Sequence, residues 1–234
     1  MKKIGRYLLL FITILMVGTF LSGCMTITQE DYLREAEKYM KKKYGEKFKA
    51  IEYGMDYRLY ISPVSHPEWR VTVSFPKAKL WNVEFQDNYV AFLLKAELES
   101  EVKNIATEVY GDCKAFCPPM GIKLPKEWNR DTPLEVYNTK NISVLYLFIG
   151  GDGCNKERDI TVFLEEYCKS DNKITLMDIV YISKGQLQEL QERDLDWLFN
   201  EKQYYLTTYV ALKGEEELSY DDVEWRAGDL QLEN

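Results

Sequence analysis

The sequence predicts an α+β protein built from two modules, and three observations carry that prediction. The first is an amphipathic segment over Thr28–Tyr44, whose apolar residues recur at three- and four-residue spacing. The second is a group of short segments after it, in which apolar and polar residues alternate as in a sheet with one solvated face. The third is a β-α-β-α-β order of segments beyond residue 136, which favours a second small α/β or α+β module.

The segment Thr28–Tyr44 has the charge order of a stable helix. Glu30 and Asp31 stand near its start and three lysines occupy positions 41–43 near its end, an arrangement that complements the helix dipole. Gly45 follows and supplies the stop. We therefore expect the first module to begin with one helix.

An antiparallel sheet and a long helix are expected to complete the first module. The expected strands are Phe48–Tyr53, Tyr57–Ser62, Trp69–Phe75 and Val83–Phe85. Asp87 or Asn88 then caps a helix that runs to Tyr110, and Gly111 ends it. The apolar stripe of that helix consists of Ala91, Leu94, Leu98, Val102, Ile105 and Val109.

Two stretches of this module carry a resemblance to a known group of proteins. They are Tyr39–Phe48, which reads YMKKKYGEKF, and Phe85–Phe92, which reads FQDNYVAF. Together with the meander between them, they resemble small exported lipoproteins of Gram-positive bacteria of unassigned function. The resemblance covers roughly residues 24–111 and implies a cystatin-like or PepSY-like module, with one helix packed on an antiparallel sheet. It implies no catalytic residues.

The pattern breaks over 113–135, where four prolines and a glycine forbid a long helix. We expect a Pro-rich linker there, between a module at 24–112 and a second module at 136–234. Within the second module we expect strands over 142–149, 173–182 and 204–212 and helices over 155–168 and 183–199. The first of these strands is apolar on both faces, which predicts a central position in its sheet.

The first 23 residues have the parts of an export signal. Lys2, Lys3 and Arg6 form a basic start, and an uncharged apolar run follows as far as Leu21. That run is shorter than the roughly 20 residues that cross a bilayer unaided. The tetrad Leu-Ser-Gly-Cys that closes at Cys24 resembles a bacterial lipobox. The resemblance implies cleavage before Cys24 and attachment of a diacylglyceryl group, with fatty acids such as palmitate, to its sulfur.

The charge of the mature chain excludes one class of partner. Removing Lys2, Lys3 and Arg6 from the 30 basic residues leaves 27 against 38 acidic ones, a net charge near −11. Binding of nucleic acid needs clustered Lys and Arg, so we expect no nucleic-acid partner. The expected partners are the membrane, through the anchor on Cys24, and an envelope protein or ligand.

Four cysteines are left in an exported chain, and an even number there favours disulfides. The candidates are Cys113, Cys117, Cys154 and Cys168. A local bridge between the first two and bridges from each of them to Cys154 and Cys168 are both open, and we favour at least one bridge that ties the linker to the second half. The spacing does not match a zinc ribbon, so no metal is expected.

Other motifs favour structural explanations. The run from Gly150 to Cys154 lacks the third glycine and the Gly-Lys-Ser/Thr of nucleotide loops, so we expect a flexible connection. His66 is the only histidine and has no evident catalytic partner. The acidic residues from Glu215 to Glu224 lack calcium-loop spacing and indicate a solvated tail or an edge strand.

The sequence therefore predicts a lipid-anchored lipoprotein on the extracellular face of the cell membrane. We expect its body to be a binding or interaction module of the cell envelope, without catalytic residues or a cofactor, rather than an enzyme. Two alternatives stay open at this point: a hydrolase that acts on the envelope, and an accessory subunit of a membrane complex.

Overall fold

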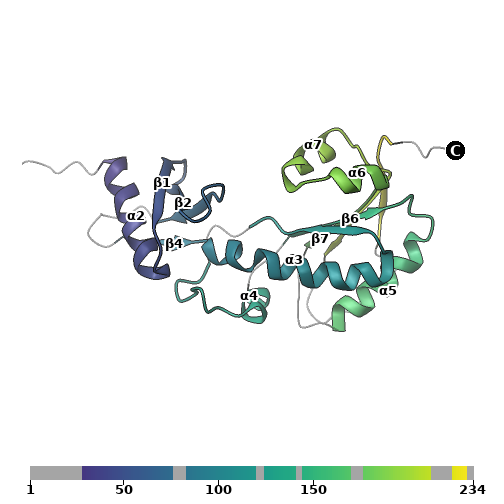
Figure 1. Cartoon of the computed structure of the whole chain (residues 1–234), viewed down its shortest axis with the longest axis horizontal. Coiled ribbons are helices and arrows are strands. Elements are labelled where there is room, and N and C mark those ends of the chain that lie inside the picture. The colour runs from purple at the N-terminus through teal and green to yellow at the C-terminus, as the bar shows by residue number, and fades with distance from the viewer. Residues whose placement is uncertain are drawn as a thin grey trace, which may run out of the picture.

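The structure, a computed structural model, describes residues 28–75, 83–119, 124–140, 144–169, 176–211 and 223–230. The predicted signal segment and Cys24 lie outside these residues, as do the acidic positions 215–217, 221 and 222. The described chain forms an α+β fold with two sheets, which confirms the predicted fold class (Figure 1).

The first sheet, sheet A, is antiparallel and has the strand order β1-β2-β3-β4. Its strands are β1 (Phe48–Tyr53), β2 (Arg58–Pro63), β3 (Val71–Ser74) and β4 (Gln86–Asp87). The second sheet, sheet B, has the order β5-β6-β7-β8-β9 and is mixed, because β6 and β7 are parallel and the other pairs are antiparallel. Its strands are β5 (Cys113–Phe116), β6 (Val144–Gly150), β7 (Leu176–Ile182), β8 (Leu206–Ala211) and β9 (Trp225–Ala227).

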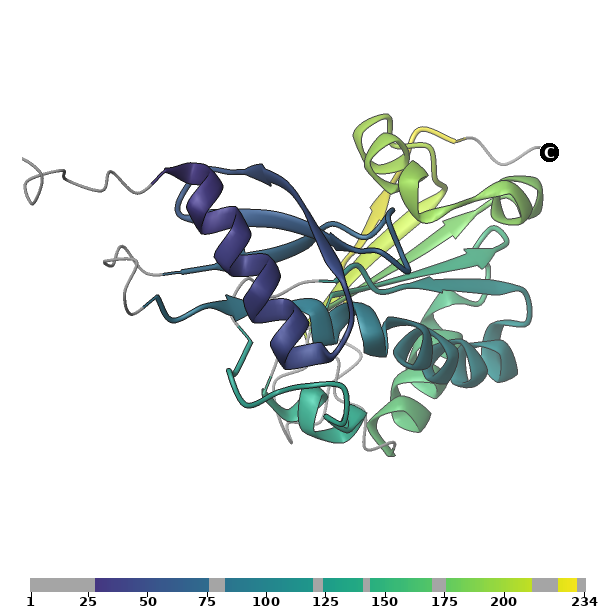
Figure 2. The same cartoon turned by 60° about the vertical axis from the view of Figure 1, so that its left-hand side comes forward.

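Helix α2 (Gln29–Tyr44) packs across β1 and β2 of sheet A, as Figure 2 shows. Its start is fixed by a capping box, in which Thr28 and Asp31 satisfy each other's backbone N–H groups. Its end is fixed by Gly45, which adopts the left-handed conformation at φ 74°. The predicted helix and its stop are therefore confirmed.

The fourth strand of sheet A lies later in the sequence than we predicted. Val83–Phe85 is not a strand, and β4 is formed by the next two residues, which pair with Ser74 and Val73. Phe85 instead turns its ring into the core, with its centroid 5.8 Å from that of Phe75. Phe85 is thus held by packing of its aromatic ring, and the backbone pairing with β3 begins only at Gln86.

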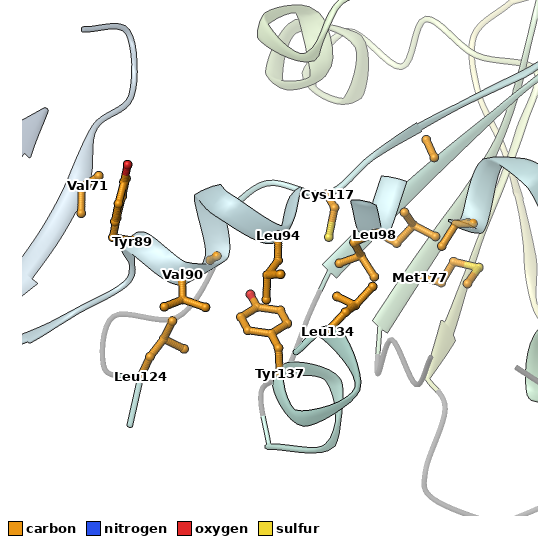
Figure 3. Packing of buried hydrophobic residues seen from close by; sticks show 14 of the residues in the cluster. Val71, Tyr89, Val90, Leu94, Leu98, Cys117, Leu124, Leu134, Tyr137 and Met177 are labelled. Atoms are coloured by element: carbon orange, nitrogen blue, oxygen red, sulfur yellow. The ribbon is translucent and has the colours of Figure 1, made fainter. Parts of the chain in front are cut away.

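Helix α3 (Tyr89–Tyr110) connects the two sheets through one continuous hydrophobic core. Its first turns pack against β3, and its later turns pack against β5 and helix α5 (Lys156–Lys169). Figure 3 shows the labelled residues of this helix pointing toward core residues from both halves of the chain. The fully or nearly buried residues of α3 are Tyr89, Val90, Ala91, Leu94, Leu98, Val102 and Ala106.

Helices cover both faces of sheet B (Figure 1). α3 and α5 lie on one face, and α6 (Lys184–Glu189) and α7 (Leu195–Asn200) lie on the other, over a second hydrophobic cluster. The central position predicted for the apolar strand at 142–149 is confirmed, since β6 lies between β5 and β7 and buries residues on both faces.

The segment predicted as a linker at 113–135 differs in the structure. It begins with β5, the edge strand of sheet B that pairs with β6, and its Leu124 and Trp128 are each only 3% exposed. Helix α4 (Leu134–Lys140) follows and packs on α3. Apolar residues among the prolines therefore bury this segment against α3.

The single helix predicted over 183–199 is wrong, although a capping box of Ser183 and Gln186 does start a helix there. The helix stops after α6, at Leu190, where the backbone becomes extended (φ −57°, ψ 129°). A 3₁₀ turn (Glu192–Asp194) then leads into α7. The ammonium group of Lys114 satisfies carbonyl oxygens that this stop leaves free, since it donates to the backbone oxygens of Gln188 and Leu190, 2.9 Å from each.

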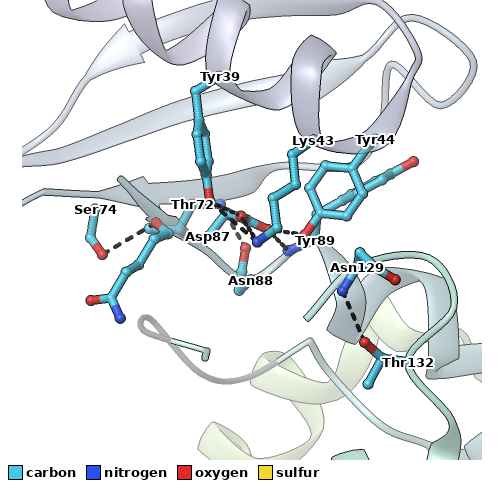
Figure 4. Close-up of polar contacts among 11 residues, drawn as sticks. Tyr39, Lys43, Tyr44, Thr72, Ser74, Asp87, Asn88, Tyr89, Asn129 and Thr132 are labelled. Atoms are coloured by element: carbon cyan, nitrogen blue, oxygen red, sulfur yellow. Dashed lines mark hydrogen bonds and ion pairs between the residues drawn. The ribbon is translucent and has the colours of Figure 1, made fainter. Parts of the chain in front are cut away.

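A buried carboxylate ties α2 to the start of α3 (Figure 4). Asp87, whose side chain is 0% exposed, accepts hydrogen bonds from the hydroxyls of Tyr39 (2.8 Å) and Tyr44 (2.6 Å). It also pairs with the Lys43 ammonium at 2.8 Å and accepts the backbone N–H of Tyr89 at 3.0 Å. A buried charge is tolerated when it is paired and hydrogen-bonded in this way.

Replacing Asp87 with Asn is expected to destabilise the protein by about 3–5 kcal/mol, the usual effect of breaking a buried ion pair. The amide would remove the charge that faces Lys43 and would set N–H donors against the tyrosine hydroxyls. Urea unfolding measures this change. The matched control is Asp56→Asn in the hairpin turn, where Asn tolerates the positive φ of 56°. Equal effects of the two substitutions would contradict the role assigned to Asp87.

Candidate functional site

A solvent-open pocket of about 400 Å³ lies where the end of α3 meets β5 and α6. Lysines from three elements line it: Lys103 of α3, Lys114 of β5 and Lys184 of α6. The other lining residues are Thr107, Gly111, Asp112, Cys113, Leu187 and Gln188. Its size is within the range of small-molecule sites.

Two backbone features shape the walls of this pocket. Gly111 ends α3 at a positive φ of 75°, which lets the chain turn directly into β5. Gly150, at the end of β6, lies so close to α6 that a Cβ atom there would stand 3.0 Å from Leu187 Cδ2 and 3.4 Å from Lys184 Cγ. α6 therefore rests directly on the end of β6, which fixes the position from which Lys184 extends.

One lining residue of the pocket, Cys113, has a thiol whose surroundings disfavour the reactive thiolate form. Burial raises the pKa of Cys113 above its usual range, so the group is protonated at neutral pH. Its sulfur lies 3.5 Å from the Thr107 hydroxyl and 3.9 Å from the backbone oxygen of Lys103. The groups that the pocket offers to a ligand are mainly positive charges and hydrogen-bond donors, which suits binding.

A second surface lies on the face of sheet B that carries α6 and α7. Asp178 of β7 is paired in register with Tyr146 of β6 and Tyr209 of β8. Burial raises the pKa of Asp178 to about 6, against the opposing effect of Arg226. Phe199 of α7 packs on Tyr146 at 5.4 Å between ring centroids, whereas Tyr209 is 49% exposed. α7 thus covers only part of this face.

The four predicted disulfide cysteines are free thiols in the structure. Cys113 and Cys117 stand four residues apart along the β5 region, a separation of about 13 Å for extended chain, which exceeds the reach of a disulfide. Cys154 precedes the start of α5, whereas Cys168 lies 12 residues after its first residue, a rise of roughly 18 Å along the helix. The bridge from the linker to the second half that we favoured stays a prediction.

The pocket lining does not include His66 or positions 151–154. His66 stacks on Trp69 with 4.1 Å between ring centroids, and its Nδ1 lies 3.2 Å from Glu68 Oε1. The run from Gly150 to Cys154 connects β6 to α5. Within the described ranges, no three His, Cys, Asp or Glu residues are grouped as a metal site would need, and no helix is both long and apolar enough to span a bilayer.

Sequence reasoning missed the lysine pocket. Lys103 and Lys114 are separated by 11 positions and Lys184 by 70 more, so no local motif joins them. The only available signal was that lysines stand near the predicted helix end at Tyr110 and the predicted helix start at 183. Such lysines are common on protein surfaces. The pairing of β5 with β6 and the contact of α6 with β6 bring these lysines together.

Thiol counting in protein that lacks residues 1–24 checks the state of the four cysteines. Cys154 and Cys168 are exposed and Cys113 and Cys117 are buried, so four free cysteines give two reactive thiols in the native protein and four after unfolding without reductant, whereas the bridge that we favoured from the sequence leaves at most two after unfolding. A reduced sample is the control. Fewer than four thiols in the unfolded, unreduced protein would instead establish a disulfide.

Asp178→Asn is expected to change how stability depends on pH. The folded pKa of about 6 exceeds the unfolded value of about 3.9, so the folded protein holds more protons between these values and its stability falls as pH rises from about 4 to 6. The asparagine variant lacks this fall. Urea midpoints at pH 4, 5, 6 and 7 measure the difference, with Asp196→Asn as an exposed control. Parallel profiles of the wild type and Asp178→Asn would contradict the raised pKa.

Comparison with known proteins adds no functional label. No protein-family model and no curated protein matches the sequence. A similar solved structure is the crystal structure of a DUF5037 family protein from Ruminococcus gnavus, with a TM-score of 0.45 and 14% sequence identity, covering 81% of this chain and 96% of that one.

Proposed function

We propose that this protein is a lipid-anchored binding module on the extracellular face of the cell membrane, and that its ligand site is the lysine-lined pocket. The observation that carries the binding role is the pocket itself, a cavity of about 400 Å³ with charged side chains from three separate elements. Sites for small ligands are typically concave and contain a few convergent polar groups.

The N-terminal segment supports the proposed location. The basic start at Lys2, Lys3 and Arg6, the apolar run and the lipobox-like tetrad before Cys24 agree with one another as an export and lipidation signal. Two acyl chains hold a protein on a bilayer stably, at about 0.8 kcal/mol for each buried CH₂ group, whereas one chain binds only marginally. The anchor would keep the pocket close to ligands and partners in the envelope.

The chemistry of the pocket supports binding over hydrolysis. Its only thiol is protonated at neutral pH, because burial raises the pKa of Cys113. Its lysines extend from rigid elements, α3, β5 and α6, which is the arrangement expected for a preorganised binding site. The module therefore presents lysine ammonium groups to a ligand from three elements, without an activated nucleophile among the lining residues.

Photocrosslinking in intact cells tests the proposal. A photoreactive residue in place of Gln188, on the pocket wall, is expected to give an adduct, and one in place of the exposed Asn200 at the end of α7 is not. Cys24→Ala is expected to lose incorporation of a labelled fatty acid, because no other sulfur stands at the lipobox position.

Two results would contradict the proposed function. A Cys24→Ala protein that is still processed and lipid-labelled would contradict the assignment of the lipid anchor to Cys24. Absence of any adduct at position 188, or equal yields of adduct at positions 188 and 200, would contradict the proposal that the pocket is a ligand site. Exposed Cys154→Ala serves as the control for loss of a cysteine elsewhere, and it should leave lipid labelling unchanged.

A further inference from the structure

The lysine pocket is an electropositive site on an acidic protein. The whole chain carries a formal net charge of −8. The pocket wall has three lysines and one aspartate, Asp112, which leaves a local formal charge of +2. A cleft lined by one sign of charge attracts ligands of the opposite sign, and the effect stands out where the surrounding surface repels them.

The three lysines are held in different ways. The ammonium of Lys114 is fixed by Gln188 and Leu190, whose backbone oxygens occupy two of its three N–H donors. Lys103 and Lys184 are exposed, and neither forms an ion pair with any residue in the part of the chain that the structure describes. Their positive charges are therefore available to a ligand.

Three other polar groups of the wall are already used within the protein: the Thr107 hydroxyl, the Cys113 thiol and the backbone oxygen of Asp112. The Thr107 hydroxyl donates to the backbone oxygen of Lys103 at 2.7 Å, and the Cys113 thiol lies beside both groups. The backbone oxygen of Asp112 accepts the N–H of Gly150 at 3.1 Å. Recognition of a ligand thus depends mainly on the lysine ammonium groups.

We propose that the pocket binds a small ligand through a compact anionic group of the phosphate type. Lys103 and Lys184 would contact the anion directly, and Lys114 would add positive charge from its fixed position. Lysine suits this task because its ammonium is a point charge with several donors, whereas planar bidentate pairing favours arginine. The inference rests on the proposed function, since it names the ligand class of the same pocket.

Calorimetric titration of the full, detergent-solubilised chain tests this inference. The soluble probes are inorganic phosphate and glycerol 3-phosphate, with glycerol as the neutral control. Short-chain phosphatidylglycerol below its micelle concentration tests a lipid headgroup as the source of the anion, with short-chain phosphatidylcholine as its zwitterionic control. We expect the anionic probes to bind, glycerol to fail, and the affinity to weaken between 50 and 500 mM NaCl, because salt screens exposed charges.

Single substitutions locate the binding. Lys103→Gln and Lys184→Gln are each expected to weaken binding of the anionic probe by roughly 5- to 10-fold, the effect of one charge-assisted contact at a partly exposed site. Lys42→Gln, which removes an exposed lysine of α2, is the matched control and should leave the affinity unchanged. Unchanged urea midpoints establish that both pocket variants are folded.

The outcomes separate this inference from the proposed function. Equal binding of glycerol and glycerol 3-phosphate, or unchanged affinity in both pocket variants, would overturn the anionic ligand. Failure of every phosphate probe would also overturn it, while a specific adduct at position 188 in cells would still support the pocket as a binding site. Loss of that adduct together with loss of probe binding would overturn both. Selective binding of phosphatidylglycerol would assign the anion to a lipid headgroup.

Discussion

The packing of one helix, α3, is the constraint on which the rest of the structure depends. Its buried face contributes to a single hydrophobic core that contains residues of sheet A and sheet B. Complete burial of a large apolar side chain contributes about 1.5–3 kcal/mol, so the buried valines and leucines of α3, Val90, Leu94, Leu98 and Val102, stabilise the fold substantially. The two modules therefore share a core along this helix. The C-terminal end of the same helix forms one wall of the pocket.

The two ends of α3 show opposite solutions for charged groups. At its start, the carboxylate of Asp87 is buried and satisfied by two tyrosine hydroxyls, a lysine and a backbone N–H. At its end, Lys103 and Lys184 stay in solvent beside the pocket. A buried charge must be paired and hydrogen-bonded within the protein, whereas an exposed charge is solvated by water and stays accessible to a ligand. The first arrangement stabilises the fold, and the second is suited to binding.

The accuracy of the sequence predictions follows the range of the interactions involved. Helix α2 was predicted nearly to the residue, because Thr28, Asp31 and Gly45 are local signals that act within one turn. The stop of α6 was missed, because no local signal marks it and the group that binds its terminal carbonyls, Lys114, lies 74 positions upstream of Gln188. The segment at 113–135 was predicted as a linker from its prolines, whereas Leu124 and Trp128 are buried by tertiary contacts that no local pattern encodes.

The sequence by itself determined the α+β class, the caps of α2, the central position of β6, and an N-terminal segment with the features of a lipidation signal. These follow from periodicity, capping chemistry and short motifs, which act over a few residues. Only the tertiary structure decided that α3 joins both sheets and that Lys103, Lys114 and Lys184 meet around one pocket. The physical reason is that strand pairing and core packing bring together residues distant in the chain, and single lysines carry no local mark of where they will lie.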